Sequence, residues 1–108
     1  MKIYNKLVRD EIPKIIRESG KTCEITILNK KQYLLELKKK LIEESNELLN
    51  AKTKEDIIEE IVDVTDVINA IINEEKIKLS NIEGKREEKN QQKGSFKKRY
   101  FLKHVSSK

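Results

Sequence analysis

Two runs of aliphatic residues at helical spacing, separated by a polar break at residues 50–53, constrain the fold of this chain most strongly. Asn29 is a natural N-cap for a helix that runs to about Leu49. Thr53, followed by Asp56 three residues later, is a variant of the capping box and begins a second helix. The buried face of the first helix is marked by Leu34, Leu37, Leu41 and Leu48. The second helix has a broader apolar set, so we expect an antiparallel hairpin whose second helix is covered on two sides.

The rest of the chain predicts smaller elements around this hairpin. Residues 8–19 favour a short helix, in which Pro13 is tolerated only near the first turn. Ser80 and Glu83 form a capping box that opens a polar helix, and Gly94 ends it. The pattern therefore predicts at least four helices.

Extended structure is limited to two candidate strands, at about 22–28 and 98–104. The chain has only 3 Gly and 1 Pro in 108 residues, too few turn residues for a sandwich or a barrel. We therefore expect an all-α fold, a bundle of four to five helices built on the hairpin, with at most these two short strands. The length predicts that residues 1–108 form one domain.

Charge is divided unevenly along a chain whose net charge is +5. Residues 1–33 hold eight Lys or Arg against four Asp or Glu, residues 34–75 five against twelve, and residues 76–108 eleven against three. The acidic middle would repel a phosphate backbone, so nucleic acid is an unfavoured partner. No apolar run is long enough for a membrane span, so no membrane partner is expected. A lone cysteine, Cys23, makes the cytoplasm the simplest location.

The most informative polar feature is a pair of acidic motifs, one on each arm of the hairpin. Glu44 and Glu47 are three residues apart and share a helix face. Glu60 and Asp63 repeat that spacing on the second helix. Glu44 and Asp63 lie equally far from the turn after Thr53, and so do Glu47 and Glu60. Residues that are equally far from the turn of an antiparallel hairpin face each other, so we expect the four carboxylates to converge.

Four clustered carboxylates repel one another, and a bound cation relieves that repulsion. Mg²⁺ prefers oxygen ligands and often binds substrate phosphates as well. One His and one Cys exclude a zinc site built from this chain alone. The predicted ion is Mg²⁺, or Mn²⁺, and its predicted ligands are Glu44, Glu47, Glu60 and Asp63. Acidic pairs at this spacing also occur by chance on solvated helices, and that interpretation stays open.

The two ends of the chain add further motifs to the central E-x-x-E and E-x-x-D pattern. Residues 5–13 read NKLVRDEIP and residues 93–99 read KGSFKKR. With the acidic pairs, these segments resemble the MazG-like all-α nucleoside triphosphate pyrophosphohydrolases, in particular a small branch similar to phosphoribosyl-ATP pyrophosphohydrolases, with its KLVRDKIP opening and RGGFxxR close. The chain departs from that pattern at Ser95, at Lys93 and at Asp66, where Gly, Arg and Glu are usual.

The resemblance implies Mg²⁺-dependent hydrolysis of nucleoside triphosphates between the α and β phosphates, as a house-cleaning removal of non-standard or surplus nucleotides. Glu43 or Glu47 would orient or deprotonate the attacking water. The predicted substrate-binding residues are Lys6, Arg9, Asp66, Lys89, Lys93 and Arg99. A homo-oligomer, a dimer or larger, is also implied, and the broad apolar set of the second helix favours it.

A function of another class stays open, namely a basic helical protein that binds nucleic acid or regulates a partner without catalysis. Such a protein would bind nucleic acid with a steep dependence on salt and would be indifferent to Mg²⁺. Within the enzyme class, phosphoribosyl-ATP and dUTP are alternative substrates. The motifs leave the preferred base and sugar open.

Overall fold

Four helices form the regular structure of the computed structural model, which describes residues 1–107. They are α1 (Ile12–Glu18), α2 (Lys30–Asn50), α3 (Lys54–Glu74) and α4 (Leu79–Lys93). The described residues contain no strand. The all-α fold predicted from the sequence is therefore confirmed.

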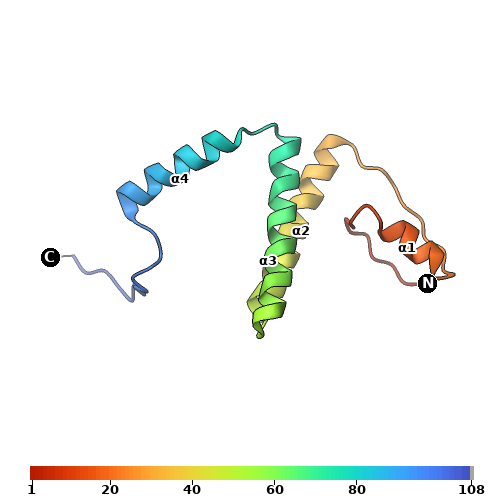
Figure 1. Cartoon of the computed structure of the whole chain (residues 1–108), viewed down its shortest axis with the longest axis horizontal. Coiled ribbons are helices and arrows are strands. Elements are labelled where there is room, and N and C mark those ends of the chain that lie inside the picture. The colour runs from red at the N-terminus through yellow and green to blue at the C-terminus, as the bar shows by residue number, and fades with distance from the viewer. Residues whose placement is uncertain (108) are drawn as a thin grey trace. The chain divides into compact units, whose positions relative to one another are not determined.

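The two long helices, α2 and α3, pack side by side as an antiparallel hairpin (Figure 1). At the start of α2, the Asn29 side chain accepts a hydrogen bond from the backbone N–H of Gln32 at 2.9 Å, and the Gln32 side chain accepts one from the Asn29 N–H. At the turn, the Thr53 hydroxyl oxygen accepts a hydrogen bond from the N–H of Asp56 at 3.1 Å. Both caps were predicted from the sequence, and both are confirmed.

The covered faces of the hairpin helices follow alternating steps of three and four residues, the spacing of helices that pack nearly antiparallel or parallel. Leu37 is 3% exposed and is the one fully buried hydrophobic residue within 1–107. The covered positions on α2 include Leu34, Leu37, Leu41, Glu44 and Leu48. Those on α3 include Glu60, Val64, Val67, Ile71 and Glu74. Acidic residues thus occupy positions in this helix–helix seam where aliphatic side chains are usual.

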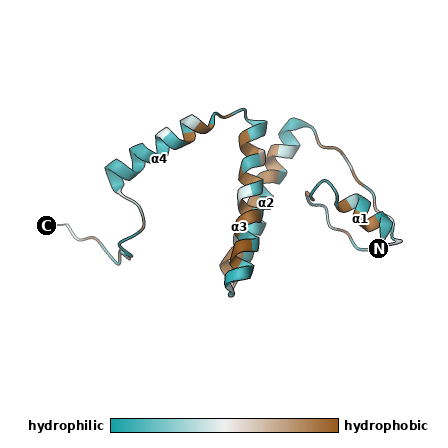
Figure 2. Ribbon diagram, in the orientation of Figure 1, coloured by the Kyte–Doolittle hydropathy of each residue, from teal (hydrophilic) through white to brown (hydrophobic). Residues whose placement is uncertain are grey.

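A second side of α3 carries aliphatic residues that are about half exposed. Brown stretches mark the hydrophobic residues along this helix (Figure 2). Ile58, Ile61 and Val62 are three and four residues apart and are 53%, 47% and 47% exposed. The sequence predicts cover on two sides, and within the described chain α2 supplies it on one. No helix of residues 1–107 combines the length and the apolar character needed to cross a membrane.

The chain divides into two compact units, residues Met1–Lys76 and the residues from Ile77 onward. The second unit contains α4, which is largely hydrophilic (Figure 2). Gly94 ends α4 as predicted, with a φ of 79° that favours glycine, and its N–H donates to the carbonyl oxygen of Asn90. That residues 1–108 form one domain stays a prediction.

Two predicted helix starts are wrong. The helix expected over residues 8–19 begins only at Ile12, because Pro13 fits a helix only within its first turn. The chain before it is therefore free to make other contacts. The capping box at Ser80 does not form, since the N-cap of α4 is Lys78, two residues earlier, and no side chain caps the helix.

The two candidate strands do not form either. Within the described chain, neither residues 22–28 nor residues 98–104 adopt strand structure. Ile27 is 93% exposed and Leu102 is 78% exposed, so neither segment has a packed apolar face. A two-stranded pair without such a face is marginal in water, which explains why alternating residues alone did not produce strands.

Replacing Thr53 with alanine removes the side-chain cap of α3 and is expected to lower the free energy of unfolding by about 1 kcal/mol. Thr65→Ala is the matched control, because the Thr65 hydroxyl only hydrogen-bonds to carbonyl oxygens of its own helix. Urea denaturation followed by circular dichroism measures both variants. Equal losses of stability would contradict the role of Thr53 at the turn.

Candidate metal centre

Three of the four predicted metal ligands come together in the seam between α2 and α3. Glu44, Glu60 and Asp63 each offer one carboxylate oxygen, and these oxygens lie within 4.8 Å of one another. All three residues are partly buried. Glu44 comes from α2, and the other two come from α3 one turn apart. The structure thus brings together opposing residues in the register that the position of the turn predicts.

Glu47, the fourth predicted ligand, lies outside this group and is exposed. It is close enough for its charge to help raise the pKa of Glu60. Glu47 forms no ion pair with any other residue within 1–107. It is therefore an acidic side chain at the edge of the cluster rather than a member of it.

Glu60 is the least compensated carboxylate of the cluster. Its Oε2 atom is buried and has no hydrogen-bond partner within the described residues. Burial raises the pKa of Glu60 above its ordinary value, and the neighbouring Glu44, Asp63 and Glu47 raise that pKa further. A buried carboxylate without a partner costs free energy that a bound cation would recover.

The donor set fits a hard divalent cation. Three carboxylate oxygens are ligands that Mg²⁺ and Mn²⁺ accept, with the remaining positions left to water or substrate phosphates. The cluster contains no imidazole or thiolate that would favour zinc or copper. The orphaned Oε2 of Glu60 is the observation that such an ion would explain.

Arg9, from the segment before α1, neutralises part of the cluster. Its Nη2 donates to Oδ1 of Asp63 at 2.6 Å, and its Nη1 donates to Oδ2 of Asp66 at 2.9 Å. Arg9 and Asp66 were both predicted to bind substrate, and in this structure they bind each other. No local sequence pattern signals these contacts, because they join residues more than 50 positions apart.

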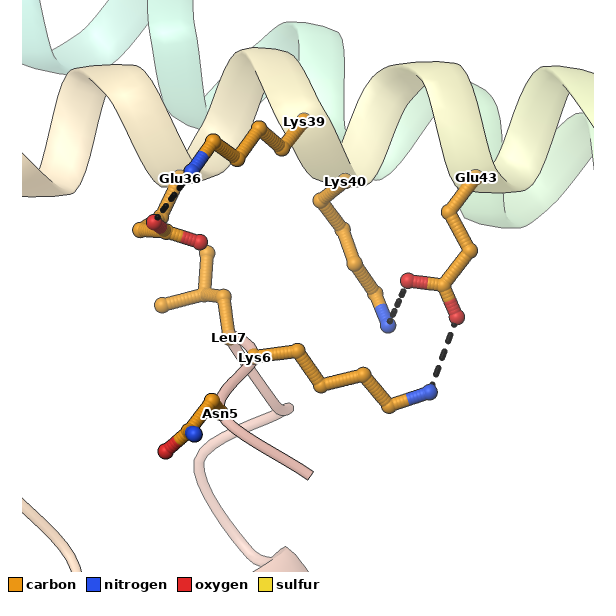
Figure 3. A pocket seen from close by; sticks show the side chains of 7 residues that line it. All are labelled: Asn5, Lys6, Leu7, Glu36, Lys39, Lys40 and Glu43. Atoms are coloured by element: carbon orange, nitrogen blue, oxygen red, sulfur yellow. Dashed lines mark hydrogen bonds and ion pairs between the residues drawn. The ribbon is translucent and has the colours of Figure 1, made fainter. Parts of the chain in front are cut away.

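Glu43 is held from two sides by lysines (Figure 3). Lys6 Nζ donates to its Oε1 at 2.9 Å, and Lys40 Nζ donates to its Oε2 at 3.3 Å. The hydrogen bond from Lys6 is the main cause that lowers the pKa of Glu43, and Lys40 adds to it. A carboxylate with a lowered pKa is a weaker base, so Glu43 is the poorer of the two predicted candidates for activating water.

Lys40 is a site residue that the sequence analysis missed. Besides Glu43, it approaches Glu44 Oε1 at 3.6 Å, and its side chain is only 18% exposed. The available signal was its position three and four residues before two glutamates, the spacing at which side chains on a helix meet. Lys40 partly balances the one cluster carboxylate that α2 supplies.

The remaining predicted substrate-binding residues, Lys89, Lys93 and Arg99, belong to the second unit. Lys89 and Lys93 are exposed and four residues apart on α4. Lys93 and Arg99 line an open hollow of about 720 Å³ together with Lys97 and Lys98. Such a lining suits a phosphate or another anion. Their role in substrate binding stays a prediction.

Glu60→Gln is expected to raise the melting temperature of the metal-free protein at pH 7. Because the folded-state pKa of Glu60 lies above 4.5, its contribution to stability is full below pH 4.5 and is lost as the pH rises through the folded pKa. The gain from the substitution should therefore be larger at pH 7 than near pH 4.5. The exposed neighbour Glu59 supplies the matched control, Glu59→Gln. If Glu60→Gln melts at or below the temperature of the control at pH 7, the ionised carboxylate of Glu60 does not destabilise the folded protein.

Comparisons with protein-family models, with curated proteins and with solved structures find no match for this chain. The residues themselves, the geometry of the hairpin and the three motifs described above are the features that bear on function. Membership of the MazG-like family is accordingly part of the proposal that follows.

Proposed function

We propose that this protein is a Mg²⁺-dependent nucleoside triphosphate pyrophosphohydrolase of the MazG-like kind. The observation that carries the proposal is the carboxylate cluster in the hairpin seam, with the buried Oε2 of Glu60 left without a partner in the described chain. Carboxylates at covered positions cost stability in the absence of a cation, so a sequence that keeps them there favours a cation-dependent role. The three motifs supply the reaction and its house-cleaning purpose.

In this proposal, Glu44, Glu60 and Asp63 hold the ion, which is Mg²⁺ or Mn²⁺. The ion would supply neutralisation of the triphosphate charge and a coordinated water of lowered pKa. Glu47 orients or deprotonates the attacking water, because it lies beside the cluster and has no ion-pair partner within the described residues. Water attacks the α-phosphorus, the bond from that phosphorus to the α–β bridging oxygen breaks, and pyrophosphate leaves.

Positive charge beside the cluster suits a triphosphate substrate. Lys6 and Arg9 are 42% and 57% exposed at the side chain, so both are open to phosphate oxygens. Arginine and lysine that meet the phosphates would balance the charge that develops on the departing pyrophosphate. A cytoplasmic location is part of the same proposal, in keeping with the free thiol of Cys23.

The protein is also proposed to be a homo-oligomer. Ile58, Ile61 and Val62 form an aliphatic stripe on α3 that is about half exposed. Exposed apolar stripes of this kind are typical of interaction surfaces, and a second copy of the same helix is a self-complementary occupant.

The alternative, a basic helical protein that binds nucleic acid, is favoured by one observation. Phe96 and Tyr100 are 101% and 86% exposed, and they flank Lys97, Lys98 and Arg99. Exposed rings on either side of a run of cations suit stacking on single-stranded bases. Binding by this route would weaken steeply with salt and would not require a divalent cation.

Incubation of the protein with Mg²⁺ and a panel of ribonucleoside and deoxynucleoside triphosphates is expected to yield a monophosphate and pyrophosphate from at least one of them. Glu60→Gln should lower kcat/KM by about 100-fold or more, because replacing even an outer-shell partner of a metal ligand commonly costs 10–100-fold. Glu59→Gln should retain activity. Turnover by none of the nucleotides, with folded protein and metal present, would reject the proposed function.

Ile58→Lys is expected to dissociate the oligomer, because the lysine charge would have to be desolvated in the proposed interface. Ile25→Lys is the matched control, since Ile25 has the same exposed fraction of 53% but lies outside the hairpin. Analytical ultracentrifugation gives the mass of each variant. A wild-type protein that sediments as a monomer at all concentrations would refute the oligomer.

A further inference from the structure

Residues Asn5–Arg9, here named the N-terminal strap, connect to both arms of the hairpin at the level of the carboxylate cluster. Lys6 binds Glu43 on α2, and Arg9 binds Asp63 and Asp66 on α3. Figure 3 shows the Lys6 side chain running from the strap toward Glu43. The strap thus brings two positive charges to the acidic face from a segment distant in sequence.

The contact of Arg9 with Asp63 involves the same carboxylate that is proposed to hold the ion. Its Nη2 atom lies 2.6 Å from Asp63 Oδ1. A divalent cation bound to Asp63 would place like charge next to the guanidinium group, and like charges at that range repel. Full engagement of Asp63 by the ion and by Arg9 at the same time is therefore unfavourable.

The strap is held in a way that permits its release. It belongs to no helix, and the ion pairs of Lys6 and Arg9 are substantially exposed to solvent. Exposed ion pairs contribute little to stability, so a cation that competes for Asp63 has little to displace.

We propose that the N-terminal strap is an internal counter-ion for Asp63 of the acidic cluster until a divalent cation binds, and that cation binding displaces it. This inference rests on the proposed metal site. Displacement releases Lys6 and Arg9 from their carboxylate partners when the ion binds, so both become better donors to phosphate oxygens in the cation-bound protein. The order in which the cation binds before the triphosphate is therefore favoured.

Because coupling between two ligands of one site is reciprocal, removal of the strap charge must strengthen cation binding. Arg9→Gln is expected to tighten the dissociation constant for Mn²⁺ about fivefold, the lower end of typical coupling, since Arg9 is more than half exposed. Arg17→Gln is the matched control, because the Arg17 side chain hydrogen-bonds to the Cys23 carbonyl oxygen rather than to an acid. Isothermal titration calorimetry at constant ionic strength measures all three proteins. Unchanged or weaker binding by Arg9→Gln would overturn the proposal.

Trypsin cleavage of the wild-type protein provides a second readout that needs no variant. Mg²⁺ is expected to accelerate cleavage after Lys6 relative to cleavage after Lys2. Lys2 is the reference site because it forms no ion pair within the described residues. The sample without Mg²⁺ is matched in ionic strength with NaCl. If the cation binds and the ratio of the two cleavage rates does not change, displacement of the strap is refuted and the proposed function stands. If the wild-type protein binds neither Mg²⁺ nor Mn²⁺, the strap and the proposed function both fail.

Discussion

Carboxylates lie partly buried in the seam between α2 and α3, and the charged contacts around the hairpin follow from their burial. Glu44 and Glu60 take positions in the three-and-four spacing that the leucines and valines of the same faces otherwise fill. A carboxylate there loses hydration and repels its neighbours, so it needs positive charge close by. Lys40 and Arg9 supply part of that charge, and the buried oxygen of Glu60 receives none.

The hairpin tolerates the free-energy cost of these carboxylates because side-chain caps define where its two helices begin. The caps at Asn29 and Thr53 satisfy backbone N–H groups at the first turns of both helices. The aliphatic part of the seam, centred on Leu37, lies nearer the open end of the hairpin than the acids do. The acidic cluster sits between that part and the turn, where the helices are held at a fixed spacing. A preorganised set of carboxylates of this kind suits a small cation better than a flexible loop would.

The fold and the core of the site could be predicted from the sequence because both depend on local signals. Thr53 with Asp56 locates the turn, and the turn alone determines that Glu44 faces Asp63. The ion pair of Arg9 with Asp63 had no such signal, since it joins residues 54 positions apart. The start of α4 was missed because the N-cap lies two residues earlier, at Lys78 rather than Ser80, and a lysine side chain cannot accept a hydrogen bond from the first turn. A strand at 22–28 or at 98–104 needs a second strand with which to pair. Alternating apolar and polar residues within one segment do not guarantee that such a strand is present.

The most direct measurement is a crystal structure of the protein grown with Mn²⁺, with anomalous scattering used to locate the ion. An anomalous peak is expected within coordination distance of Glu44, Glu60 and Asp63, with the orphaned oxygen of Glu60 among its ligands. A map with no peak between these carboxylates at millimolar Mn²⁺, in crystals where the hairpin is intact, would contradict a metal site in the seam.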